Sequence, residues 1–162
     1  MQNKSAKSHL HTGSSSNTQV GHNFELAAQA FFESQGFKLE RGLAVPVGVE
    51  KIRKKHSFDL GCNHKKILVE CKSHKWTSGG NVPSAKLTIW NEAMYYFLAA
   101  PKNYRKIMFV LRDFSKKRKE TLARYYIRTY NHMIPSDVEF WEYDESTGKA
   151  EILLPDNSSP EQ

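Results

Sequence analysis

Apolar side chains recur at helical spacing in three stretches of the chain, and this periodicity predicts three helices. In the first stretch, Phe24 and Phe31 lie on one apolar face, and Gly36 follows as a stop signal because glycine adopts the left-handed conformation at little cost. Ser84 and Ser115 open the other two stretches and are the expected N-caps. The predicted helices span residues 23–35, 84–99 and 115–131.

Shorter apolar or alternating segments between the helices predict strands. In the clearest of them, Val69 points to one side, and Glu70 and Lys72 point to the other, because side chains alternate along a strand. A turn at residues 61–64 joins this strand to the one before it, which predicts a hairpin. The predicted strands begin near residues 37–39 and then span residues 57–60, 66–73, 106–112, 138–143 and 150–154.

These elements follow the order α-β-β-β-α-β-α-β-β, which indicates an α/β fold with helices covering a sheet. The apolar run at residues 106–112 indicates a strand buried on both faces. Residues 1–20 are rich in Ser, Asn, Lys and Thr, have little apolar surface to bury, and are predicted to form a flexible arm. Residues 21–154 are expected to form a single domain, and residues 155–162 a polar tail.

The composition of the chain limits the classes of function that we expect for it. A chain of 162 residues with 39% hydrophobic side chains suits one domain with its own core. Because no apolar stretch has membrane-spanning length and the N-terminus has no apolar signal segment, we expect no membrane association and a cytoplasmic location. Cys62 and Cys71 are then expected to be free thiols. Lys and Arg outnumber Asp and Glu by 24 to 17, which favours a polyanionic partner such as nucleic acid.

Candidate chemistry gathers around the predicted hairpin. Glu70 and Lys72 share one strand face, and Asp59 lies across the turn, so pairing of the strands can bring two carboxylates and an ammonium together. Two carboxylates make the oxygen environment that Mg²⁺ or Mn²⁺ prefers, and the metal relieves their repulsion. Glu25, near the start of the first predicted helix, can add a carboxylate. An ammonium beside a metal-bound carboxylate suits phosphodiester hydrolysis.

Asp59, ten intervening residues and the run Glu70-Cys71-Lys72 resemble the PD-(D/E)xK signature of the restriction-endonuclease-like nucleases. Phe58 stands where that family has a proline, at a permissive position. By this resemblance, Asp59 and Glu70 are metal ligands, the main-chain carbonyl of Cys71 is a further ligand, and Lys72 is the catalytic lysine. The resemblance implies a Mg²⁺-dependent endodeoxyribonuclease in which Mn²⁺ substitutes for Mg²⁺.

A second pattern, Gly21-x-x-Phe24-Glu25-x-x-Ala28, is similar to the first helix of that superfamily, nearest to its restriction-enzyme and Holliday-junction-resolvase branches. Glu25 matches the first-helix acid that some branches use for metal binding. The resemblance covers residues 21 to about 113 and implies a mixed central sheet flanked by helices. Many members act as homodimers, so a homodimer is expected by analogy.

Two basic segments are candidates for DNA contact. They are Lys51, Arg53, Lys54 and Lys55, just before the first acid, and Lys116, Lys117 and Arg118, at the expected start of the third helix. Cations oppose the dipole at a helix start, and a bound phosphate would relieve that conflict. Trp76 is a candidate for stacking on a base.

Several alternatives stay open at this point. The acids and the lysine of the hairpin can be ordinary surface charges, and Cys62, His64, Cys71 and His74 are four possible zinc ligands at an unusual spacing. The chain can be a nucleic-acid-binding module or accessory subunit with a degenerate nuclease site. It can also be a nuclease of the same fold that acts on a branched junction or on RNA.

Overall fold

The computed structural model describes residues 16–157. Within them the fold is α/β, with three α-helices, a mixed six-stranded sheet and a small two-stranded sheet. The helices are α1 (Asn17–Ser34), α2 (Ser84–Ala99) and α3 (Leu122–Tyr130), which continues into the 3-10 helix η1 (Asn131–Met133). The strands are β1 (Glu40–Val47), β2 (Lys54–Cys62), β3 (Ile67–Lys72), β4 (Arg105–Leu111), β5 (Phe114–Ser115), β6 (Glu120–Thr121), β7 (Val138–Asp144) and β8 (Lys149–Leu154).

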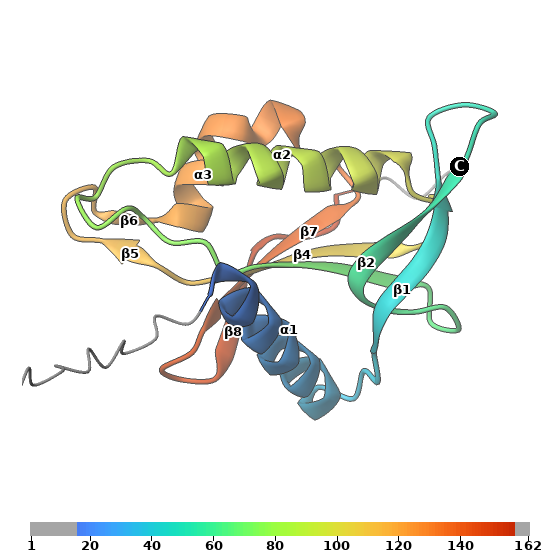
Figure 1. The fold of residues 1–162 in the computed structure, drawn as a ribbon, viewed down its shortest axis with the longest axis horizontal. Coiled ribbons are helices and arrows are strands. Elements are labelled where there is room, and N and C mark those ends of the chain that lie inside the picture. Colours follow the sequence, from blue (N-terminus) through green and yellow to red (C-terminus); the bar gives the residue numbers. More distant parts are fainter. Residues whose placement is uncertain (1–15, 158–162) are drawn as a thin grey trace, which may run out of the picture.

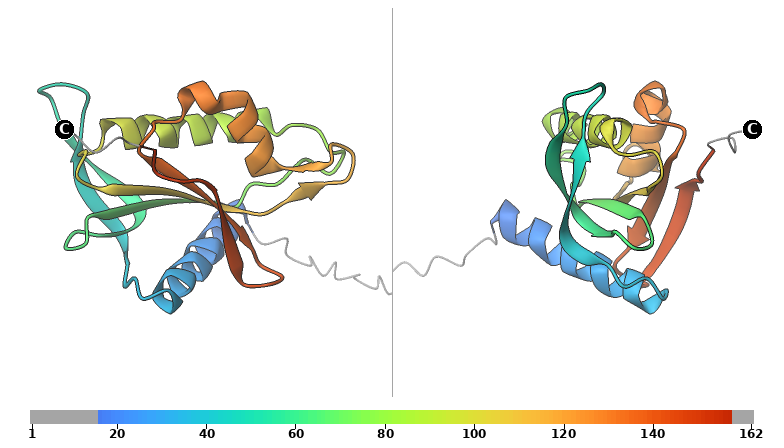
Figure 2. Two further views of the ribbon diagram at one scale, coloured as in Figure 1. Left: turned by 180° about the vertical axis from the view of Figure 1, so that it is seen from behind. Right: turned by 90° about the vertical axis from the view of Figure 1, so that its right-hand side faces the viewer.

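The large sheet has the strand order β1-β2-β3-β4-β7-β8. Its central pairs β3–β4 and β4–β7 are parallel, and the pairs toward both edges are antiparallel. The predicted hairpin is therefore present as the antiparallel pair β2–β3. Helix α1 lies on one face of the sheet, and α2 and α3 lie on the other (Figures 1 and 2).

Two hydrophobic clusters lie on the two faces of the sheet. On the side of α2 and α3, Leu68 and Met108 pack with Trp90 of α2. On the side of α1, Val69 and Phe109 pack with other apolar residues. The alternation predicted for β3 is confirmed, and the apolar run in β4 is buried on both faces. Within residues 16–157, none of the helices has the length and apolar character needed to cross a membrane.

The starts of the helices differ from the predictions. Helix α1 begins at Asn17, and its N-cap Ser16 accepts a hydrogen bond from the N–H of Gln19 (3.2 Å), so the predicted arm does not extend to residue 20. The rest of that arm, residues 1–15, and residues 158–162 of the predicted tail lie outside the described residues. Helix α2 has the predicted bounds, but its N-cap is Pro83 instead of Ser84, without a side-chain cap.

The third helix begins seven residues later than predicted. Ser115 ends β5, and residues 116–119 form the turn to β6, with Lys119 at a φ of 57°. The N-cap is Thr121, whose side chain accepts from the N–H of Arg124 (3.3 Å). Four consecutive cations at residues 116–119 oppose the dipole at a helix start, and the hairpin turn avoids that conflict.

Candidate active site

The backbone pairing between β2 and β3 ends next to the candidate catalytic residues Asp59 and Glu70. The ladder ends at the pair Leu60–Val69. Beyond it, the N–H of Cys71 donates to Asp59 Oδ2 (2.7 Å). The Asp59 carboxylate thus bonds the main chain of β3 where the two strands no longer pair.

The strand around Asp59 does not alternate regularly. Phe58 packs in the cluster on the α2 side, whereas Leu60 packs in the cluster on the α1 side, although residues two apart in a regular strand share a face. Gly42 of β1, opposite Asp59 in the register, has a φ of +66°. This local distortion turns Asp59 toward β3.

Asp59, Glu70 and Lys72 gather at this point. Lys72 Nζ lies 2.6 Å from Glu70 Oε2 and 3.6 Å from Asp59 Oδ2. The Glu70 residue is only 6% exposed, and Lys72 is largely buried. One ammonium is therefore the counter-ion of two carboxylates in a place with little access to water. Burying these charges lowers the stability of the fold, which indicates that they have a functional role.

The electrostatics of these groups follow from burial and mutual charge. Burial, followed by the charge of Glu70, raises the pKa of Asp59 to about 6. Burial also acts to raise the pKa of Glu70, but His56 and Lys72 lower it overall. Burial acts to lower the pKa of Lys72, but Glu70 and Asp59 raise it, so the ammonium stays charged. As the pH falls, Asp59 is therefore the acid of this pair that takes up a proton first.

His56 is a member of this group that sequence analysis missed. Its ring stacks on Tyr96 of α2 (centroids 3.6 Å apart, 8° between planes), and its Nε2 lies 3.7 Å from Glu70 Oε1. Within residues 16–157 this buried Nε2 has no hydrogen-bond partner. His56 is three residues from Asp59, which in a regular strand places the two on opposite faces, so alternation gave no signal for it.

Glu25 forms an ion pair with Arg41 and, within residues 16–157, has no hydrogen bond or ion pair with the three central groups. It lies in the middle of α1, and its carboxylate accepts from Arg41 Nη2 of β1 (2.8 Å). Its charge still contributes to raising the pKa of Asp59, after larger contributions from burial and Glu70. Glu25 is therefore a neighbour of the site whose carboxylate is engaged by Arg41.

Among residues 16–157, no group of three or more His, Cys, Asp or Glu side chains is arranged to hold a metal ion. The possible zinc set is thus not assembled, because Cys71 packs on the α1 side and His74 Nδ1 accepts from Trp90 Nε1 (2.8 Å). Asp59 and Glu70 supply two carboxylates around one cationic group. This donor set fits Mg²⁺, which commonly binds through one or two carboxylates and keeps several waters.

The basic segments occupy two hairpins. Lys51 and Arg53 lie in the connection from β1 to β2, beside Ile52, which is 83% exposed, and Lys54 and Lys55 begin β2. The other set, Lys116, Lys117 and Arg118, lies in the turn between β5 and β6. Arg118 packs over the ring of Trp76 (5.1 Å) and donates from Nε to the Gly80 carbonyl (2.9 Å), so its role is at least partly structural.

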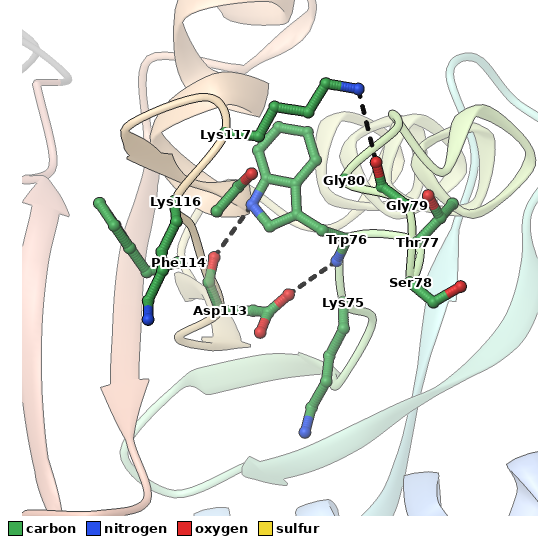
Figure 3. Close-up of a pocket in the computed structure, with 11 residues that line it drawn as sticks. Lys75, Trp76, Thr77, Ser78, Gly79, Gly80, Asp113, Phe114, Lys116 and Lys117 are labelled. Atoms are coloured by element: carbon green, nitrogen blue, oxygen red, sulfur yellow. Dashed lines mark hydrogen bonds between the residues drawn. The ribbon is translucent and has the colours of Figure 1, made fainter.

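Two neighbouring pockets lie near the candidate site, and the first includes Lys72. One, of about 570 Å³, is lined by Cys71, Lys72 and residues of α1 and the start of α2. The other, of about 430 Å³, lies between residues 75–80 and the β5–β6 hairpin (Figure 3). Lys75 and Thr77 line both pockets, so the two are neighbours on either side of this segment.

Comparison of the chain with models of protein families, with curated proteins and with solved structures finds no match.

Proposed function

We propose that this protein is a Mg²⁺-dependent endodeoxyribonuclease of the PD-(D/E)xK type, with a restriction-endonuclease-like fold. The observation that carries the proposal is the position of Lys72 Nζ, 2.6 Å from Glu70 and 3.6 Å from Asp59. The same three residues make up the sequence signature, although Asp59 is eleven residues from Glu70 in the chain. The mixed α/β sheet with helices on both faces supports the fold assignment.

In this proposal Asp59 and Glu70 hold the metal, with the Cys71 carbonyl as a further ligand. When bound, the metal polarises the scissile phosphate and lowers the pKa of a water molecule. Lys72 donates hydrogen bonds to the attacking water and to a phosphate oxygen, which opposes the charge that develops there. His56, stacked on Tyr96 of α2, places its Nε2 3.7 Å from Glu70 Oε1, close enough to influence the charge of that carboxylate. Glu25, engaged by Arg41, adds negative potential at the site.

The DNA substrate is held by the basic hairpins on either side of these acids. Lys51, Arg53, Lys54 and Lys55 line one approach, and Lys116 and Lys117 line the other. The net charge of +7 supports a polyanionic substrate. A homodimer and a cytoplasmic location complete the proposal, the latter in keeping with two free cysteines.

The test is cleavage of supercoiled plasmid DNA by the purified protein with Mg²⁺, Mn²⁺ or EDTA. We expect nicked and linear products with either metal and none with EDTA. Asp59→Asn, purified in parallel, distinguishes this activity from a contaminating nuclease. If DNA is bound but not cut under any of these conditions, the protein is a binding module or accessory subunit and the proposal is wrong.

A further inference from the structure

The two neighbouring pockets lie beside the candidate active site, and Lys72 lines the first of them. We call the pair of pockets the lysine groove and define it by Lys72 and Lys86 in the first pocket, Lys75, which lines both, and Lys116 and Lys117 in the second. Asp113 is the single acid that lines either pocket in the described residues, and its carboxylate accepts from the Trp76 N–H (2.7 Å). Lysines therefore outnumber acids in the lining of each pocket, and Lys72 is the lysine among them that pairs with Glu70 and Asp59.

The walls of the lysine groove are held by hydrogen bonds between distant segments. Trp76 bonds Asp113 twice, through its main-chain N–H (2.7 Å) and through its indole Nε1 to the Asp113 carbonyl (3.1 Å), as Figure 3 shows. Arg118 bonds the Gly80 carbonyl from the β5–β6 hairpin. A groove that is already assembled does not need to be ordered when a ligand binds, which favours affinity.

One aromatic ring is available to a ligand in the second pocket. Phe114 of β5 lines the pocket and is 49% exposed, with the Arg112 guanidinium 6.0 Å from its ring. Trp76, the ring that the sequence suggested for base stacking, is only 8% exposed and lies between Arg118 and Tyr125. Phe114, and not Trp76, is therefore the ring that can stack on a base.

A row of cations that ends at an exposed aromatic ring is the arrangement that binds single-stranded nucleic acid, whose phosphates follow the cations and whose unpaired bases stack on the ring. A duplex keeps its base faces stacked internally and offers none to Phe114.

From these observations we propose that the lysine groove binds a single-stranded DNA extension, with its phosphates at Lys75 and Lys116 and a base on Phe114. The inference rests on the proposed function for one point, the position of the scissile phosphate beside Lys72. The preferred substrate is then a duplex whose cleavage site adjoins an unpaired strand, such as a flap or a fork.

Binding in EDTA tests this inference separately from cleavage. Fluorescence anisotropy is measured with a blunt duplex and with the same duplex carrying a single-stranded extension of about eight nucleotides, within the roughly 4–16 that such sites cover. We expect the extended DNA to bind about tenfold more tightly, and Phe114→Ala to remove most of that preference, as the loss of one base stack does. Lys75→Gln with Lys116→Gln is expected to weaken the extended DNA more than the blunt duplex.

Tyr95→Ala is the matched control, because Tyr95 is an exposed ring of α2 that does not line the groove. Equal affinity for blunt and extended DNA, or an unchanged preference in Phe114→Ala, overturns the inference. If the preference holds in EDTA but plasmid DNA is never cut, the proposed nuclease function is wrong and the single-strand site stands. If plasmid DNA is cut but the extended DNA is not preferred, the single-strand site is wrong and the proposed nuclease function stands.

Discussion

Asp59 Oδ2 accepts the hydrogen bond of the Cys71 N–H at 2.7 Å, at the point where β2 and β3 cease to pair. This bond holds the Asp59 carboxylate of β2 at the main chain of Cys71 in β3, the residue directly after Glu70. Lys72 then bridges Asp59 and Glu70. The charges of Asp59, Glu70 and Lys72, more than their packing, determine how substitutions here change activity and stability.

Asp59→Asn is expected to lower the rate of DNA cleavage by at least about 100-fold, because a neutral amide is a poor ligand for Mg²⁺. The amide oxygen can still accept from Cys71, so the fold is expected to persist. Single-turnover cleavage at saturating Mg²⁺ measures the effect, with Glu33→Gln, at an exposed position on α1, as the control. A rate near that of the parent protein contradicts the role given to Asp59.

Lys72→Met is expected to reduce the free energy of unfolding by about 3 kcal/mol in EDTA at pH 8, because it leaves the buried Glu70 and the half-buried Asp59 without their cation. Urea denaturation measures the loss. Asp59→Asn in the Lys72→Met background removes the repulsion and is expected to recover part of the stability. Additive effects of the two substitutions speak against a shared charge interaction.

The raised pKa of Asp59 predicts a pH dependence of stability in the absence of metal. An acid with a higher pKa in the folded state binds its proton more tightly there, so its contribution is complete below the unfolded pKa of 3.8 and is lost as pH rises through about 6. The full difference corresponds to roughly 3 kcal/mol. Glu70, whose pKa is lowered, acts in the opposite direction.

Comparing the parent protein with Asp59→Asn by thermal unfolding in EDTA between pH 4 and 7 isolates the contribution of Asp59. The stability of the variant relative to the parent is expected to rise across this range. A constant difference between the two curves contradicts the raised pKa.

Divalent metal is expected to stabilise the folded protein, because it binds the two carboxylates only when the fold brings them together. Mg²⁺ or Mn²⁺ at about 100 times its dissociation constant adds roughly 2.7 kcal/mol to the free energy of unfolding. Differential scanning calorimetry with metal and with EDTA measures this, and Asp59→Asn is expected to lose most of the shift. An equal shift in the variant places the metal elsewhere.

The basic residues at the start of β2 are expected to contribute salt-dependent affinity for DNA. Changing Lys54 and Lys55 to Gln leaves up to two phosphates without a neutralising ammonium. The slope of log affinity against log salt is therefore expected to become shallower by about one for each of these phosphates. Lys149→Gln, at an exposed position on β8, is the control. Unchanged slopes show that DNA does not lie along this hairpin.

Local sequence patterns were sufficient for the parts of the fold that depend on local geometry. The alternation along β3 separated Val69 from Glu70 and Lys72, and the apolar run in β4 indicated a strand buried on both faces. The helix at 84–99 and the β2–β3 hairpin were also predicted correctly. Both depend on patterns of apolar and turn residues that lie close together in the sequence. The predicted start of the third helix was wrong, because residues 116–119 form the turn between β5 and β6 instead of the first turn of a helix.

The sequence by itself determined which residues carry the acids and the ammonium, and that Glu70 and Lys72 share a face, since that follows from the repeat of a single strand. Only the tertiary structure decided that Asp59 turns toward β3, that His56 stacks beside Glu70, that Glu25 pairs with Arg41, and that Phe114 and not Trp76 is exposed. These outcomes depend on contacts between segments far apart in the chain, where burial and competing partners determine the direction in which each side chain points.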